Sequence, residues 1–448
     1  KAPRRRLCQE AAAERRPMYY DDSVIEQSTQ QKLLWHLLPL LCLLSMASTL
    51  NRLTLEYAAP AMGPALNLTA TQLGIADNLF CVGYLLASLP AALLLLRFGA
   101  RRWITGIVLA SGIIALAHAL VWNAASLYAA RLLLGAAEAG LLPAMVFYLT
   151  AWIPGRHRAK AIAALIAAPA LVPLIARPAS EVLLLLGGLF DISDWRFMFV
   201  VEGLPTVWLG LFVPARVPQA PTEVSWLPPS ERIWLLDQLR GNVAPGAPIR
   251  FADGLRSAAM RKLAAVQGII GLVGGSLGLW VPLAMQQSGY VPPDVGNAIM
   301  LTASAIGAAG AVAAGLVWDR RSYWRRALAV CLALAGVCLG TAAVLPFGIV
   351  AVLMLAIVAA MVPAILALAW ILAPCVLAGA AAAAGFAVLS MSGTLGDYAP
   401  AGLAVARLDA GGRCLILAVA CLVSAWLVRG LDGRHPAELT ASAASPGE

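Results

Sequence analysis

Long apolar runs take up most of this 448-residue chain. Each run is close to the roughly 20 residues that an α-helix needs to cross the hydrocarbon core of a bilayer. They lie at about 33–57, 72–96, 103–121, 125–151, 159–189 and 197–213, and, after a polar interval, at about 263–285, 294–317, 325–346, 348–369, 371–406 and 413–429. The sequence therefore predicts an all-α membrane protein with 12 transmembrane helices in two pseudo-symmetric six-helix bundles.

The composition excludes the main soluble classes. Charged residues make up 12% of the chain, against about 25% in an average globular protein. A soluble enzyme, a disordered chain and a nucleic-acid-binding protein are therefore excluded, even at a net charge of +9. The eight cysteines are scattered and include no C-x-x-C pair, so we expect neither a disulfide framework nor a zinc site. We expect no cofactor.

The basic residues predict the orientation, because Lys and Arg are enriched in cytoplasmic loops. If the N-terminus is cytoplasmic, most of the 32 Lys and Arg residues fall in cytoplasmic segments, and the outer loops keep Arg196, Arg407 and Arg413. No short apolar core with a small-residue cleavage site precedes Leu33, so we expect a retained first span rather than a signal peptide. Both termini are thus expected in the cytoplasm, at the cell membrane.

The segments outside the runs define the expected domains. Residues 1–32 and 430–448 are cytoplasmic tails, 33–213 and 263–429 are the six-helix bundles, and 214–262 is a cytoplasmic linker with a short amphipathic helix near Glu231–Leu239. Two such halves around a linker are typical of a transporter that rocks about a central site.

A basic turn occurs at the same place in each half. Arg97–Arg102 follows the second run, and Gly315–Arg321 follows the eighth. Anchoring to anionic headgroups alone accounts for each turn. Their matching positions favour a duplicated six-helix unit.

With these features, the chain resembles the major facilitator superfamily, and within it the anion:cation symporter family of sugar-acid, tartrate, phthalate and other organic-anion transporters. The motifs that carry the resemblance are Phe80–Pro90, Arg131–Pro143, Trp195–Pro205 and Trp226–Arg232, within about 33–429. The resemblance implies alternating-access transport of a small organic anion together with protons. The expected partners are this anion, protons and the lipid bilayer, with no nucleic acid, and we expect a monomer.

An arginine stands within the first span. A charged side chain costs about 2.5–3.5 kcal/mol at the centre of a membrane helix, so it needs a partner or a purpose. The planar fork of Arg52 suits a substrate carboxylate, and the resemblance implies that it is a substrate-site residue. The alternative is a structural pair with an acid elsewhere.

Arg131 and Glu138 stand two helical turns apart in the fourth span, about 10 Å along the axis. They share one face and could reach a common polar cavity. Burial favours the neutral form of the Glu138 carboxyl group, and a nearby arginine favours its ionised form. The arrival of substrate can therefore change whether Glu138 carries a proton. The resemblance implies that Glu138 couples protons with Arg131 as its neighbour. The alternative is a static ion pair.

Other candidates come from the remaining motifs. The Tyr84 phenol is expected to contact substrate or to pack at an interface, and Thr54, one turn beyond Asn51, to reach the same cavity. Trp280 walls the cavity or sits in an aromatic belt. Glu202 is expected to give structural support.

Several positions depart from the family pattern. Asn51 replaces the acid of an Asp-Arg pair and cannot titrate, and Ser88 replaces an amide or acid. Ser390 and Thr394 stand in a span that is usually rich in asparagine. Asp397 has no partner nearby in the sequence, so it is either a solvated carboxylate or a relocated proton site. Arg177 and Glu181 are spaced for an i, i+4 ion pair.

Four other functions remain open or are disfavoured. The loss of the acid at Asn51 leaves open a proton-independent facilitator or exchanger. The departures of several cavity residues from the family pattern leave open a non-transporting receptor with a transporter fold. An enzyme is disfavoured, because Gly274–Gly278 matches G-x-S-x-G within a membrane helix and not on a strand–turn–helix corner. A channel is disfavoured because no ring of like charges is evident.

Overall fold

The computed structural model describes residues 22–155, 157–186, 193–241, 250–288, 293–317, 321–345, 349–403 and 410–431. These residues form helices and turns and contain no strand. The first half consists of α2 (Asp22–Ala65), α3 (Ala70–Phe98), α4 (Ala100–Ala117), η1 (His118–Leu120), α5 (Ala124–Glu138), α6 (Leu141–Trp152), α7 (Arg158–Ala167), η2 (Ala168–Leu171), α8 (Val172–Leu186) and α9 (Asp194–Arg216). The linker carries η4 (Pro221–Glu223), α10 (Pro229–Gly241) and α11 (Phe251–Arg256). The second half consists of α12 (Ala258–Ser288), α13 (Pro293–Val317), α14 (Arg321–Val344), α15 (Ile349–Val376), α16 (Gly379–Leu403) and α17 (Ala410–Arg429).

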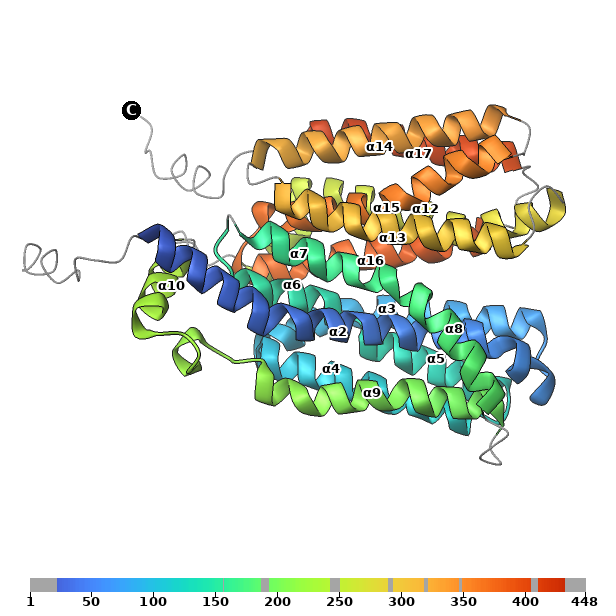
Figure 1. Ribbon diagram of the computed structural model, residues 1–448, viewed down its shortest axis with the longest axis horizontal. Coiled ribbons are helices and arrows are strands. Elements are labelled where there is room, and N and C mark those ends of the chain that lie inside the picture. The colour runs from blue at the N-terminus through green and yellow to red at the C-terminus, as the bar shows by residue number, and fades with distance from the viewer. Residues whose placement is uncertain are drawn as a thin grey trace, which may run out of the picture.

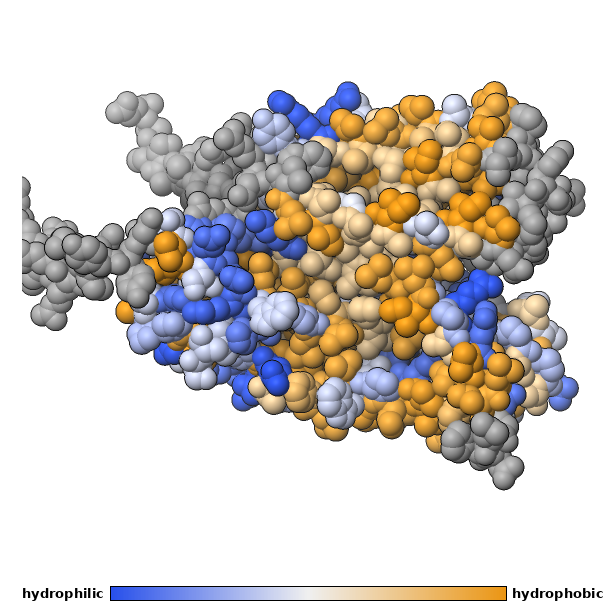
Figure 2. Space-filling model, viewed as in Figure 1, coloured by the Kyte–Doolittle hydropathy of each residue, from blue (hydrophilic) through white to orange (hydrophobic). Residues whose placement is uncertain are grey.

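The expected all-helical membrane fold is confirmed. Within the described residues, 11 helical segments are long and apolar enough to cross a membrane, counting α5–α6 and α7–α8 as one segment each. The 31-residue α12 lies beside them as a further long helix. Hydrophobic side chains cover the flanks of the helices in Figure 2. Among the exposed apolar residues are Leu185 (81% exposed) and Val344 (84% exposed). This apolar surface suits contact with lipid chains.

The two halves lie one above the other in Figure 1, with α10 at one end. We call this end the linker end and the other the far end. α3 packs along α16, and α7 packs against α13 and α15, so these helices form the interface between the halves. Hydrophilic side chains gather near α10 in Figure 2.

The helix α2 begins earlier than the expected first span, because Asp22–Gln31 are also helical. This extension is polar and binds the linker. Lys32 Nζ donates to Glu231 Oε1 at 2.7 Å, and Ser28 Oγ donates to the same oxygen at 2.9 Å. The ring of His36 stacks on Trp226, with 4.3 Å between centroids. The start of α2 therefore anchors the linker to the first half.

Two expected spans are interrupted. The fourth breaks between α5 and α6 at Gly140, whose φ of +93° is accessible to glycine and strained for other residues. The fifth passes through the 3₁₀ turn η2, which contains Pro169. Proline lacks the amide hydrogen needed for the regular α-helical ladder. The first break directly follows Glu138.

The boundary between the expected spans 348–369 and 371–406 differs from the structure. Helix α15 continues to Val376, and α16 starts at Gly379, whose φ is +59°. Apolar residues run through both helices without a polar loop, so hydropathy gives no signal for the turn. A glycine in the left-handed region marks it instead.

Candidate substrate cavity between the halves

A cavity of about 320 Å³ lies between the two halves. It is lined from both halves and collects polar side chains in an otherwise apolar wall. Its polar and charged lining consists of Ser45, Ser48, Thr49, Arg52, Tyr84, Glu138, Gln267, Ser390, Thr394 and Asp397. A concave, mainly apolar site with a few convergent polar groups is the usual form of a small-molecule site.

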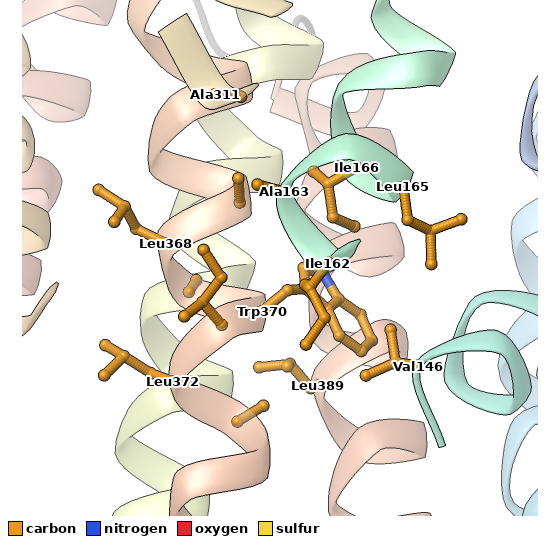
Figure 3. Packing of buried hydrophobic residues seen from close by; sticks show 14 of the residues in the cluster. Val146, Ile162, Ala163, Leu165, Ile166, Ala311, Leu368, Trp370, Leu372 and Leu389 are labelled. Carbon is orange, nitrogen blue, oxygen red and sulfur yellow. The ribbon is translucent and has the colours of Figure 1, made fainter. Parts of the chain in front are cut away.

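Towards the linker end, tightly packed apolar side chains close the cavity. Trp370 of α15 is 1% exposed and lines the cavity, and Figure 3 shows it beside Ile162 of α7 and Leu389 of α16. Further along, the backbones of α7 and α13 approach closely, since a Cβ built on Gly315 would lie 2.5 Å from the Ala163 Cβ. No room for substrate passage remains at this contact.

Towards the far end, a second cavity of about 320 Å³ shares Gly274 and Val362 with the first. It is lined by Glu56 and Tyr57, one turn beyond Arg52 on α2, and by Arg177 of α8. The second cavity thus adjoins the central cavity on the side of the far end, while packed side chains close the central cavity towards the linker end.

Arg52 forms an ion pair with Asp397 across the two halves. Arg52 Nη1 donates to Asp397 Oδ2 at 3.2 Å, and the two side chains are 36% and 35% exposed. Both line the central cavity. Asp397 is therefore not the unpartnered, solvated carboxylate that the sequence suggested, because helix packing brings it to Arg52.

Glu138 lies at the end of α5 and lines the same cavity. Its Oε2 accepts a hydrogen bond from Ser48 Oγ at 2.8 Å, while its buried Oε1 has no hydrogen-bond partner among the described residues. A buried oxygen without a partner is costly, so this atom suits a proton or a donor group of a ligand.

Arg131 is fully buried and does not line the cavity. Its Nη2 donates to the backbone carbonyl of Arg52 at 3.2 Å, and no ion pair within 4.0 Å joins it to Glu138 in the described part of the chain. Arg131 thus supports the backbone of α2 behind Arg52. Neither the shared cavity nor the static ion pair that the sequence suggested occurs.

The hydroxyls predicted in the second and eleventh spans meet at the interface, where α3 packs along α16. Tyr84 Oη and Ser390 Oγ are 2.6 Å apart and share a hydrogen bond. Thr394 lies one turn further along α16 and also lines the cavity. These groups can contact the uncharged part of a bound molecule.

Three predicted substrate residues lie outside the cavity. Asn51 is buried and accepts a hydrogen bond from Thr206 Oγ1 at 3.2 Å. Thr54 Oγ1 donates to Glu202 Oε2 at 2.5 Å, and Ser88 Oγ donates to the carbonyl of Tyr84 at 2.6 Å. Asn51 and Thr54 therefore face α9. Residues three apart lie on the same face of a helix, and Arg52 lies on a different face of α2.

Glu202 is a buried carboxylate that accepts hydrogen bonds from two neighbouring helices. It is 5% exposed, and its second oxygen accepts a hydrogen bond from Ser180 Oγ at 2.9 Å. Together with Thr54 it links α2, α8 and α9. Arg177 and Glu181 form the expected i, i+4 pair, with 3.5 Å between Nε and Oε1, on an exposed part of α8.

The sequence interpretation missed Gln267 and Ser48. Gln267 of α12 is 4% exposed and lines the cavity, and its Oε1 has no hydrogen-bond partner among the described residues. A lone amide inside the run at 263–285 was the available signal. Ser48 gave none, because serine is common in membrane helices. Trp280 belongs to α12, but its side chain lies outside the described residues.

Within the described residues, no group of three or more His, Cys, Asp or Glu side chains is arranged to hold a metal ion. The polar lining of the cavity offers one arginine, two carboxyl groups, hydroxyls and an amide among the described residues. Such groups can bind an oxygen-rich anion and hold or release protons.

Comparison with known families gives one match across most of the chain. The model of the Major Facilitator Superfamily matches residues 41–404. A protein from Agrobacterium vitis named "Putative tartrate transporter" is 31% identical over 84% of this chain and 87% of its own length. The "Quinolone resistance transporter" of Acinetobacter baumannii is 30% identical, covering 83% of this chain and 87% of that protein.

Solved structures share the fold at low sequence identity. The proton:xylose symporter XylE, bound to 6-bromo-6-deoxy-D-glucose, superposes with a TM-score of 0.72 at 16% identity, covering 92% of this chain and 99% of that one. The human organic anion transporter MFSD10 gives a TM-score of 0.63 at 12% identity, with coverages of 88% and 99%.

Proposed function

Because the chain belongs to the Major Facilitator Superfamily, we propose that this multi-pass membrane transporter carries a small organic anion, a carboxylate or sugar acid, by proton-coupled symport. The halves alternate between access from the far end and access from the linker end around the central cavity. The linker end and both termini face the cytoplasm in this proposal, and the protein acts as a monomer in the cell membrane.

The observation that carries the proposal is the place of Arg52. It is the one cation among the described residues that line the central cavity. A guanidinium offers two parallel hydrogen bonds to a carboxylate. The substrates named for the Agrobacterium vitis relatives support an anion of this kind for this chain too.

The rest of the lining suits a hydroxylated carboxylate. The Oε1 atoms of Gln267 and Glu138 are acceptors without partners in the described structure, so they suit hydroxyl donors of a substrate. Tyr84, Ser390 and Thr394 supply hydroxyls that both donate and accept. We assign orientation of the uncharged part of the substrate to these five residues.

We assign the coupling proton to Glu138. Its carboxyl group lines the cavity and accepts a hydrogen bond from Ser48. A proton on Glu138 removes a negative charge from the cavity as the anion arrives, and its release on the cytoplasmic side resets the carrier. A ligand drives such a cycle only if it binds the two conformations with different affinity.

Asn51 favours a second candidate, a facilitator or exchanger that uses no protons. The amide cannot titrate, and Thr206 holds it away from the cavity. Purified protein in vesicles with an internal pH-sensitive dye separates the two candidates. Internal acidification during uptake supports symport, and uptake without a pH change supports the facilitator.

The substrate class is tested by thermal unfolding of detergent-purified protein with tartrate, sugar acids, aromatic carboxylates and neutral sugars, at acidic and neutral pH. A ligand that binds the native state raises the melting temperature. Stabilisation by carboxylates, lost in Arg52→Ala, supports the proposal. Stabilisation by neutral sugars alone would overturn the anion assignment.

A further inference from the structure

The guanidinium that is assigned to the substrate already holds a carboxylate. Arg52 Nη1 binds Asp397 Oδ2 at 3.2 Å, and the side chains of both residues are about one-third exposed, at 36% and 35%. Arg52 comes from α2 of the first half, and Asp397 from α16 of the second. The pair therefore lies where the substrate is proposed to bind. It also joins the two halves, which move relative to each other in the proposed transport cycle.

Asp397 and a substrate carboxylate would use the same donors. A bound substrate would bring a second carboxylate against Arg52, next to that of Asp397. Two carboxylates that share one cation in a poorly hydrated site repel each other, and the proton that neutralises one of them removes the repulsion. Competition and proton uptake are therefore linked at this position.

The surroundings of Asp397 leave Arg52 as its main charged partner. α12 presents glycines beside it, since a Cβ on Gly274 would lie 4.0 Å from Asp397 Oδ1, and α15 contributes Val362 to the same wall. Among the described residues, the other titratable or charged groups that face this region are Asp77, Cys81 and Tyr84 from α3, Glu138 and the more distant Arg131 from α5, and Tyr398 from α16 itself.

We propose that Asp397 is an internal competitor for the substrate. It occupies Arg52 in the unloaded cavity, and a proton taken by Asp397 from the solvent in the cavity releases Arg52 to the substrate carboxylate. This inference rests on the proposed function and deepens it. Asp397 would then take the part of the acid that Asn51 replaces in the first span, since the titratable partner of Arg52 lies on the opposite half.

Carboxylate affinity across pH tests the competition. The probes are tartrate and gluconate, bound to detergent-purified wild type, Asp397→Asn and Glu181→Gln. At neutral pH, Asp397→Asn should bind the probe at least about tenfold more tightly, because loss of a charge-assisted competitor frees Arg52. Its affinity should also change less between acidic and neutral pH than that of the wild type.

Glu181→Gln is the matched control, because it removes one carboxylate from another arginine pair, on the exposed part of α8. It should keep the wild-type affinity and pH profile. Asp397→Ser serves as a second variant if the asparagine protein does not fold, and the same gain in affinity is expected of it.

The outcomes separate the inference from the function. If the wild type binds a probe and the Asp397 variants bind it with the same affinity and pH profile, the competitor role is wrong and the transport proposal stands. If the Asp397 variants lose binding, the competitor role is also wrong, because Asp397 then helps to bind the probe, as an acceptor for its hydroxyl groups. If no protein binds either probe at any pH, the organic-anion function and the inference are both overturned.

Discussion

Tyr84 on α3 and Ser390 on α16 share a hydrogen bond of 2.6 Å that joins the two halves at the wall of the central cavity. Together with the Arg52–Asp397 ion pair, it is a polar contact across the interface between the halves. A carrier that alternates between two conformations must break such contacts in each cycle. Each bond across the interface therefore stabilises the conformation in which it forms relative to the other.

The Tyr84–Ser390 bond predicts coupling between two substitutions. Tyr84→Phe and Ser390→Ala should each lower the stability of the purified protein, and the double variant should lose no more than either one. The coupling energy should be about 0.5–1.5 kcal/mol, the usual net value of a neutral hydrogen bond. Thermal unfolding measures it. Ser424→Ala is the control, because its hydroxyl bonds within α17 and its effect should add to that of Tyr84→Phe.

Arg52 predicts how carboxylate recognition fails. Arg52→Ala should abolish carboxylate binding and leave neutral analogues unaffected. Arg52→Lys should weaken binding, since lysine keeps the charge but lacks the planar fork. Equilibrium binding measures both. Arg177→Ala, in the exposed pair on α8, should retain wild-type affinity. Normal carboxylate transport by Arg52→Ala would show that the assignment is wrong.

Glu138 predicts a separation of exchange from accumulation. Glu138→Gln mimics the protonated carboxyl, so the loaded carrier should still exchange substrate across the membrane. Proton-driven accumulation should fall, because residue 138 no longer takes up and releases a proton. Counterflow and pH-gradient-driven uptake in vesicles measure the two activities. Undiminished accumulation in this variant would exclude Glu138 as the coupling group.

Glu202 predicts a loss of stability without a loss of recognition. Glu202→Ala should lower the free energy of unfolding by about 1–3 kcal/mol, because Thr54 and Ser180 lose their buried acceptor. The melting temperature measures this, and the KM of the remaining folded carrier should not change. Glu181→Ala, whose side chain is 69% exposed, should cost little. A raised KM in Glu202→Ala would place Glu202 in the transport site.

Gly315 predicts a shift between conformations. A side chain at this position meets the Ala163 Cβ at 2.5 Å, so Gly315→Leu should prevent the linker end from closing. A cysteine placed at Met145 in the cavity, in a protein without native cysteines, should then react faster with a reagent supplied from the linker side. Gly310→Leu is the control, because nothing lies within 4 Å of its Cβ. Equal labelling of the two leucine variants contradicts this gating role.

Several features of the site were predictable from the sequence because they depend on residue type alone. Arg52 and Glu138 stand out as charges in apolar runs, where the cost of burial demands a partner or a function. Both line the cavity. Pro169 in the fifth run is another such signal, because proline lacks the amide hydrogen of a regular helix, and η2 interrupts the span there.

Other features were not predictable, because they depend on how helices rotate about their axes. Thr54 and Ser88 belong to the right spans, but their hydroxyls bond to Glu202 and to a carbonyl of α3, away from the cavity. Gln267 faces the cavity although it stands among apolar residues. Hydropathy is nearly uniform around these helices, so no polar face indicates which side packs inward.

Membrane insertion follows from the chain alone, since the length of an apolar run is a local property and determines whether it can cross a bilayer. The partner of Arg52 is not a local property. Asp397 lies 345 positions away, and no spacing rule joins the two. Only when α2 and α16 pack against each other across the interface between the halves do the guanidinium and the carboxylate come within hydrogen-bonding distance.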